Sequence, residues 1–154
     1  MITFNALDSA DVRRIRRERI DSYGNPVEVH VSDGEVYPCR HCLGKIAQGK
    51  ESLVLAHRPF KSRNPYAETG PIFFCAEACT RPKPSNDLPG ILLAPEFIVR
   101  GYDSEERIIY GIGKVTATSQ IKAYATDLLT DPQVAFVDIR SARNNCFQCR
   151  VHRA

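Results

Sequence analysis

The six cysteines fall into three close pairs along the chain, and paired cysteines are typical of metal and redox sites. The pairs are Cys39 with Cys42, Cys75 with Cys79, and Cys146 with Cys149. A Cys-x-x-Cys turn lets two thiolates face one ion, and two such turns complete a tetrahedral zinc site. The first pair lies in PCRHCLG, where Pro38 begins a turn and Gly44 is expected to close it in left-handed geometry.

The second half of a zinc site has two candidate pairs. Cys146 and Cys149 repeat the Cys-x-x-Cys spacing, so they are the first choice of partners for Cys39 and Cys42. An alternative second pair is Cys75 and Cys79, which are four residues apart and share a face in a helix or a strand. Buried cysteine without a ligand is the simpler interpretation. A redox pair is less favoured, because it needs a helix N-terminus to lower the thiol pKa.

A long irregular stretch, HRPFKSRNPYAETGP, is the second place where chemistry is expected. Loops of this length are uncommon in compact domains and are often functional. Its polar groups, with Arg58, Tyr66 and Glu68 as candidate binding residues, suit a pocket wall for a small anion or a peptide. The simpler alternative is a packed surface loop whose aromatic side chains reach the core.

A reactive thiol beside this loop would make the protein a small enzyme that acts on an anionic small molecule. The candidate catalytic residues are Cys79, His57 and Glu68, because a cysteine beside a histidine can form a nucleophilic pair. The pairing is unspecific, since any cysteine and any histidine fit it. The sequence shows no Gly-rich phosphate loop and no serine nucleophile elbow. No particular reaction is therefore predicted.

The elements that must position these residues indicate an α+β protein with a mostly antiparallel sheet and two main helices, as a single compact domain over residues 1–154. An N-terminal helix is expected over 9–20, capped by Asp8, with a thin apolar stripe that suits a peripheral position. A second helix is expected over 119–129 from its apolar spacing. Strands are expected at 27–31 (half-buried), 52–57, 72–75, 134–139 and after residue 146, with a hairpin of 97–102 and 107–112.

The composition predicts a soluble cytoplasmic protein. Apolar residues make up 43% and charged residues 25%, as in ordinary globular chains. No basic leader precedes an apolar core at the N-terminus, and the longest apolar run, IFFCA, is far too short to span a bilayer. A reducing compartment favours metal binding, redox chemistry or simple burial for the cysteines over structural disulfides.

The basic residues gather at the two ends of the chain. Residues 140–154 contain four arginines and no acid, and Arg140 and Arg150 are taken as candidate binding residues for this reason. The net charge is only +3 and the pI about 8.6, below the value of about 9 that is usual for nucleic-acid-binding domains. A small molecule or a protein is therefore a more plausible partner than nucleic acid, and no membrane partner is expected.

Several motifs resemble, in this order, a bacterial family of small proteins known only as a domain of unknown function. They are PCRHCL, RPF, PYAETGPIF, VRGYD and RSARNNCFQCRV, which together span about Tyr37 to Arg153. The resemblance implies a cytoplasmic bacterial protein and no assigned activity. It also implies that His often stands at the position of Cys75 and that the position of Cys149 is not always Cys. His and Cys are both zinc ligands, so the resemblance weakens Cys146 with Cys149 and raises the chance that Cys75, with Cys79, is a ligand or active-site position.

The leading hypothesis is a binding or regulatory module with a structural zinc site. A site of four thiolates leaves no open position for water, so no metal catalysis follows from it. The alternative is the small thiol enzyme described above.

Overall fold

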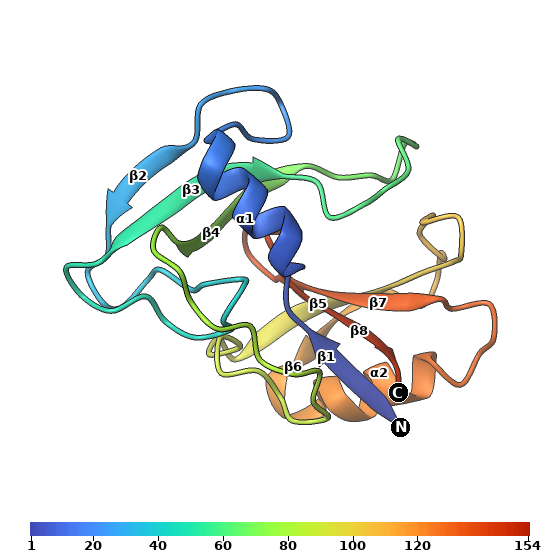
Figure 1. The fold of residues 1–154 in the computed structure, drawn as a ribbon. Helices are drawn as coiled ribbons and strands as arrows, with labels where there is room; N and C mark the ends of the chain where they lie inside the picture. The colour runs from blue at the N-terminus through green and yellow to red at the C-terminus, as the bar shows by residue number, and fades with distance from the viewer.

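The computed structural model describes residues 1–154 and contains two antiparallel sheets and two α-helices (Figure 1). The strands are β1 (Ile2–Asn5), β2 (Glu28–Val31), β3 (Glu51–His57), β4 (Gly70–Cys75), β5 (Glu96–Tyr102), β6 (Lys114–Ala117), β7 (Phe136–Ser141) and β8 (Phe147–Arg153). The helices are α1 (Ser9–Glu18) and α2 (Ile121–Leu128), and the short 3-10 helix η1 (Thr118–Gln120) leads into α2. The α+β prediction with antiparallel pairing is confirmed, and the number of domains stays a prediction.

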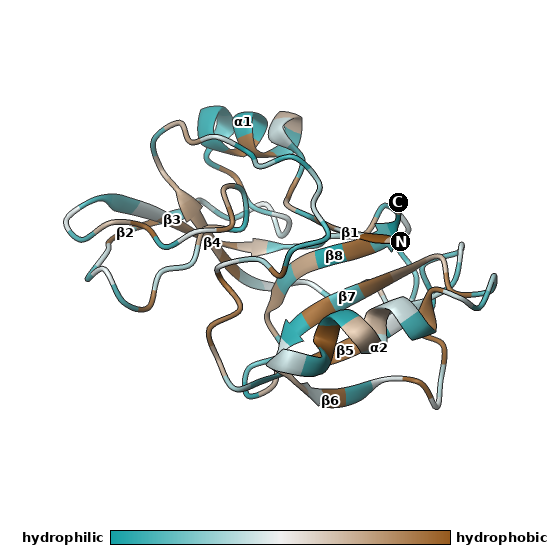
Figure 2. Ribbon diagram, turned by 90° about the horizontal axis from the view of Figure 1, so that it is seen from below, coloured by the Kyte–Doolittle hydropathy of each residue, from teal (hydrophilic) through white to brown (hydrophobic).

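The larger sheet has the order β1-β8-β7-β5-β6, and α2 packs on one of its faces (Figure 2). Val99, Val137 and Ile139 from the strands meet Ile121 and Ala125 from α2, and all five side chains are fully buried. Burial of each larger aliphatic side chain stabilises the fold by roughly 1.5–3 kcal/mol. No helix in the molecule is long and apolar enough to cross a membrane.

The smaller sheet has the order β2-β3-β4 and is covered by α1 (Figure 1). Val12 and Ile15 of α1 pack against Leu53 of β3 and Phe74 of β4. Asp8 caps the helix as expected, since its carboxylate accepts the backbone N–H two residues on at 2.7 Å. The amphipathic pattern therefore predicted α1 correctly, although the buried stripe makes it part of a core.

The first strand was not expected from the sequence. β1 pairs antiparallel with β8, so that Phe4 lies opposite Val151 at the edge of the larger sheet. The two ends of the chain consequently lie side by side (Figure 1). Residues 2–5 do alternate between buried and half-buried positions, but only four residues carry this pattern.

Two other predictions about strands were wrong. β2 was expected to be half-buried, yet Val29 and Val31 are 46% and 64% exposed because β2 is an edge strand with no layer over it. Residues 107–112 do not form the second strand of a hairpin, and β5 pairs instead with β6. A single bridge, between Tyr102 and Ile108, is all that forms of the expected hairpin, and the Ile112 side chain packs over Gly101, where a Cβ would stand 2.7 Å from it. Residues 109–112 thus pack on β5, and pairing resumes only at β6.

Candidate metal centre

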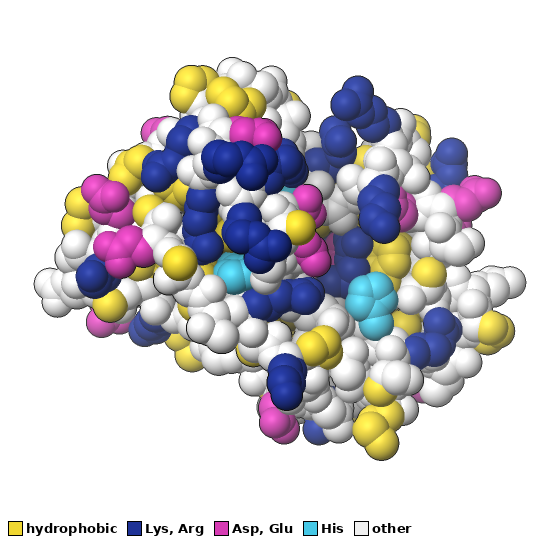
Figure 3. All heavy atoms as spheres, in the orientation of Figure 1, with side chains coloured by type: hydrophobic (Ala, Val, Ile, Leu, Met, Phe, Trp, Pro, Cys, Tyr) yellow, Lys and Arg dark blue, Asp and Glu magenta, His cyan; other side chains and the backbone are white.

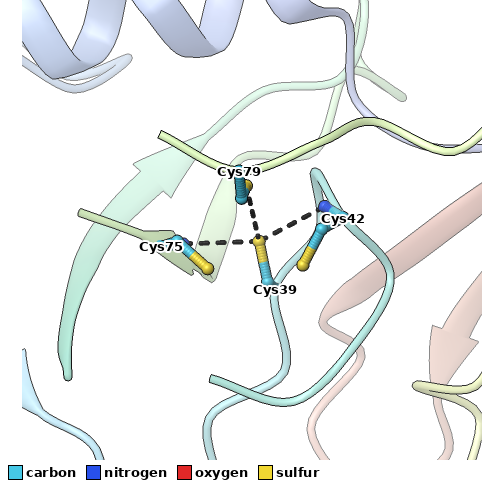
Figure 4. A group of neighbouring side chains, drawn as sticks. All are labelled: Cys39, Cys42, Cys75 and Cys79. Atoms are coloured by element: carbon cyan, nitrogen blue, oxygen red, sulfur yellow. Dashed lines mark hydrogen bonds between the residues drawn. The ribbon is translucent and has the colours of Figure 1, made fainter. Parts of the chain in front are cut away.

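Four cysteines from three separate segments converge at one point (Figure 4). Cys39 and Cys42 lie in the turn before β3, Cys75 ends β4, and Cys79 lies in the loop that follows. All four sulfur atoms lie within 4.8 Å of one another, and the Sγ atoms of Cys39 and Cys79 are 3.8 Å apart. Zn–S bonds of about 2.3 Å place the sulfurs of a tetrahedral site about 3.8 Å apart. The four cysteines could therefore hold a metal ion.

The turn that carries Cys39 and Cys42 is closed by backbone hydrogen bonds. The Cys39 N–H donates to the Gly44 carbonyl at 2.8 Å, and the Leu43 N–H donates to the Cys39 carbonyl at 2.9 Å. The left-handed residue is Leu43, with φ of 57°, and not Gly44 as expected. The left-handed conformation costs a non-glycine residue about 1–2 kcal/mol. Burial of the Leu43 side chain in the core of the larger sheet offsets this cost.

Arg40 attaches this turn to both sheets. Its backbone N–H donates to the carbonyl of Phe73 in β4 at 3.0 Å, and its side-chain Nε donates to the carbonyl of Phe147 in β8 at 2.8 Å. The side chain is buried, and burial lowers the pKa of Arg40 to about 10. Because the turn is bonded to β4 two residues before Cys75, the first cysteine pair faces Cys75.

Cys39 lies at the centre of the cluster and is fully buried. Its sulfur accepts the backbone N–H groups of Cys42 at 3.4 Å and of Cys75 at 3.3 Å. Hydrogen bonds from the thiols of Cys42 and Cys75 hold the pKa of Cys39 well below its ordinary range. The same bond raises the pKa of Cys42 to about 11, and the pKa of Cys75 is raised as well. The lowered pKa favours the thiolate form of Cys39, which is the form that binds a metal ion.

Two cationic or polar side chains contact Cys79, and sequence reasoning missed both. His41 Nδ1 lies 3.0 Å from the Cys79 sulfur, and Arg16 Nη2 donates to it at 3.2 Å. Arg16 also donates through Nε to the Cys75 carbonyl at 3.0 Å, and His41 Nε2 lies 2.9 Å from the Ser9 hydroxyl. A ring N–H at Nδ1 that donates to sulfur leaves Nε2 to accept from Ser9. These groups would orient and partly neutralise a thiolate ligand.

Cys146 and Cys149, the first choice for the second pair, lie outside the cluster. The Cys149 side chain is buried in the core beneath α2, where burial raises the pKa of its thiol. The Cys146 sulfur lies 3.7 Å from the Asn144 carbonyl in the turn before β8. Residues three apart near an extended strand point to opposite faces, so these two thiols do not converge. The alternative pair, Cys75 and Cys79, takes their place beside Cys39 and Cys42.

Two of the other candidate residues, Glu68 and Arg140, connect the long irregular stretch HRPFKSRNPYAETGP to the larger sheet. The Glu68 carboxylate accepts hydrogen bonds from Arg100 at 2.9 Å and from Asn145 at 2.8 Å, and pairs with Arg140 at 2.9 Å. The Arg140 side chain is only 3% exposed and that of Glu68 is 32% exposed, so the contact between loop and sheet shields the pair in part from solvent. Tyr66 accepts a hydrogen bond from another tyrosine hydroxyl at 2.9 Å near the surface.

His57, Arg58 and Arg150 line a cleft of about 290 Å³ that also borders α1 and β8. Figure 3 shows Lys and Arg side chains, with Asp and Glu side chains among them, around the hollow at the centre of this face. None of the 15 residues in its wall is a cysteine. The structure therefore brings the candidate catalytic residues Cys79 and His57 to different sites.

No curated protein and no solved structure matches the chain. A family model described as "Protein of unknown function (DUF1203)" matches residues 36–153. The matched region contains the four clustered cysteines and the loop that lines the cleft. The resemblance seen in the sequence motifs is thereby confirmed, and the chain belongs to the DUF1203 family of proteins of unknown function.

Proposed function

We propose that this protein is a small binding module whose fold is held together by a structural zinc ion at Cys39, Cys42, Cys75 and Cys79. The observation that carries this proposal is the convergence of the four sulfur atoms within 4.8 Å. Four thiolates in a tetrahedral arrangement are typical of zinc, which is bound as a closed structural site. Bound zinc would supply a cross-link and would leave no coordination position for a substrate or a water molecule.

Three of the four cysteines lie in two long irregular segments, and Cys75 ends β4 beside the second of them. Residues 32–50 and 76–95 contain no regular helix or strand. Long irregular segments lose much conformational entropy when they become ordered. A metal that joins both segments to the end of β4 would supply free energy that these segments do not obtain from a hydrogen-bonded ladder.

The thiol enzyme is the less favoured of the two functions. The cleft that contains His57 and Arg58 has no cysteine in its wall, so no nucleophilic thiol faces it. Cys79 is instead surrounded by the other three cysteines, His41 and Arg16. Six free thiols also suit a reducing compartment, which supports the cytoplasm as the proposed location.

The first experiment measures metal content by mass spectrometry on untagged protein purified without oxygen, together with a count of reactive thiols. We expect about one zinc per chain and four protected thiols. Cys75→Ser and Cys79→Ser should lose the metal and melt at a lower temperature. Cys146→Ser is the matched control, because its thiol lies outside the cluster, and it should keep both the metal and the melting temperature.

Metal-free wild-type protein with six reactive thiols would refute the proposal. Loss of zinc in Cys146→Ser, with retention of zinc in Cys75→Ser, would show that Cys146 binds the metal and Cys75 does not. The proposed set of ligands would then be refuted. One thiol that reacts far faster than the rest in metal-free protein would support the enzyme instead.

A further inference from the structure

We propose that the cleft at the junction of α1, β3 and β8 binds a small organic anion that carries a carboxylate or phosphate group. The anionic group would be held by Arg58, Lys61 and Arg81, which all line the cleft. A volume of about 290 Å³ is at the lower end for small-molecule sites, so the ligand has only a few carbon atoms. This site lies apart from the cysteines, and the proposal does not depend on a bound metal.

The three cations of the cleft have no carboxylate partner in the protein. None of them belongs to an ion pair, which is unusual for three positive groups that share one concave surface. Arg81 is fixed from one side, because its Nη2 donates to the Ala6 carbonyl at 2.9 Å. Its Nε is buried and has no hydrogen-bond partner. Such an unpaired buried donor is costly unless a ligand or a water satisfies it.

Three acidic residues also line the cleft, and each already accepts a hydrogen bond or pairs with a cation of the protein. Asp8 accepts a backbone N–H of α1 at 2.7 Å, and Asp11 pairs with Arg14 at 3.5 Å. Glu106 accepts two backbone N–H groups of the loop at 3.1 and 2.6 Å. These bonds leave the carboxylates charged, so an anion would be attracted by the three unpaired cations and the buried Nε–H of Arg81 rather than by the cleft as a whole.

His57 is a further polar group in the wall of the cleft. Its side chain is only 9% exposed, lines the cleft and makes no hydrogen bond with the protein. Burial lowers the pKa of His57 to about 4, so the imidazole is neutral at pH 7 and offers one donor and one acceptor. Its ring nitrogens are not among the fully buried atoms that lack a partner, so water can reach them. A ligand hydroxyl or carboxyl oxygen would bond to these nitrogens in place of water.

Part of the remaining wall of the cleft is aromatic. Phe60 and Phe147 line it, and the Arg150 guanidinium lies 5.1 Å and 6.0 Å from their ring centroids. Arg150 is neutralised by Asp138, to which it donates at 2.7 and 2.9 Å. It therefore acts here as a planar surface rather than as a free charge. A short carbon skeleton can pack on this wall while its anionic end meets the three free cations.

The proposal can be tested by titrating the full-length protein, as purified, with succinate, with inorganic phosphate and with neutral butanediol, followed by NMR. Succinate or phosphate should shift the amide signals of residues 58–61 and 81 and the ring signals of His57. Lys61→Met should weaken binding about tenfold, since it removes one charge-assisted contact from an exposed side chain without a structural role. Lys122→Met, an exposed lysine on α2, is the matched control and should leave the affinity unchanged.

Each outcome has a definite meaning. Binding of succinate alone identifies a carboxylate ligand, and binding of phosphate alone identifies a phosphate ester. Equal weakening by Lys61→Met and Lys122→Met would reveal only a general charge effect and would overturn the proposal. Absence of shifts with both anions, or equal shifts with butanediol, would also overturn it. Because the metal content is measured on the same sample, failure here is separable from failure of the zinc proposal.

Discussion

The ion pair between Asp138 and Arg150 joins β7 to β8 in the larger sheet. The substitution Asp138→Asn tests how much this pair contributes to stability. Asp138 is fully buried in β7, and both of its carboxylate oxygens accept hydrogen bonds from Arg150 in β8, at 2.7 and 2.9 Å. The guanidinium also lies 3.8 Å from the centroid of the Phe136 ring. Asparagine keeps the shape of the side chain but removes the negative charge.

The expected loss follows from the burial of the two partners. Removal of one member of a buried pair destabilises a protein by about 3–5 kcal/mol, because the other charge is left without compensation. Arg150 retains 18% exposure of its side chain, and water can therefore reach part of the guanidinium. We expect Asp138→Asn to lower the free energy of unfolding by about 3 kcal/mol, the low end of this range.

The assay is denaturant unfolding of wild type, Asp138→Leu, Arg150→Met and the double variant, alongside Asp138→Asn. Replacement of both partners by apolar residues should cost much less than the sum of the single changes, since no unpaired charge remains. Strict additivity would refute the reasoning, because it would mean that the two side chains contribute independently. A loss below about 1 kcal/mol in Asp138→Asn would equally show that the pair behaves as a surface salt bridge.

Three other predictions follow from burial. Burial lowers the pKa of His57 to about 4 in the folded protein, against 6.5 in the unfolded chain, so the unfolded chain binds more protons between these two pH values. The free energy of unfolding should therefore decrease as the pH falls from 6.5 to 4. His57→Gln should flatten this pH dependence in denaturation curves. Leu53→Ala should cost about 2–5 kcal/mol in thermal unfolding, whereas Val31→Thr on the exposed edge should stay within about 0.5 kcal/mol. Glu68→Gln should cost about 2 kcal/mol and raise hydrogen exchange in residues 58–69, because it leaves the buried Arg140 without its carboxylate.

Local patterns predicted the helices well because their signals are contained within one turn or two. Asp8 caps α1, and Val12 and Ile15 mark its buried stripe. β1 escaped prediction, although Ile2 and Phe4 alternate correctly, because its partner lies at the far end of the chain. A four-residue strand cannot be recognised from its own pattern, because its stability depends on the strand with which it pairs.

The choice between cysteine pairs shows the same limit more sharply. Spacing alone favoured Cys146 and Cys149, since it is identical to that of the first pair. What decides the matter is the hydrogen bond from the Arg40 N–H to the Phe73 carbonyl, which brings the turn to β4. No local signal encodes this bond, and the resemblance to the family only raised the chance that Cys75 and Cys79 belong to the cluster.

The proposed metal centre and the proposed anion cleft share one short piece of chain. Cys79 lies in the cluster, and Arg81, only two residues further, lines the cleft and bonds to Ala6 between β1 and α1. Arg16 of α1 contacts Cys79 from the other side. A metal that fixes Cys79 would thus also fix the position of Arg81. If both ligands bind, linkage requires that the anion strengthen metal binding by the same factor by which the metal strengthens anion binding.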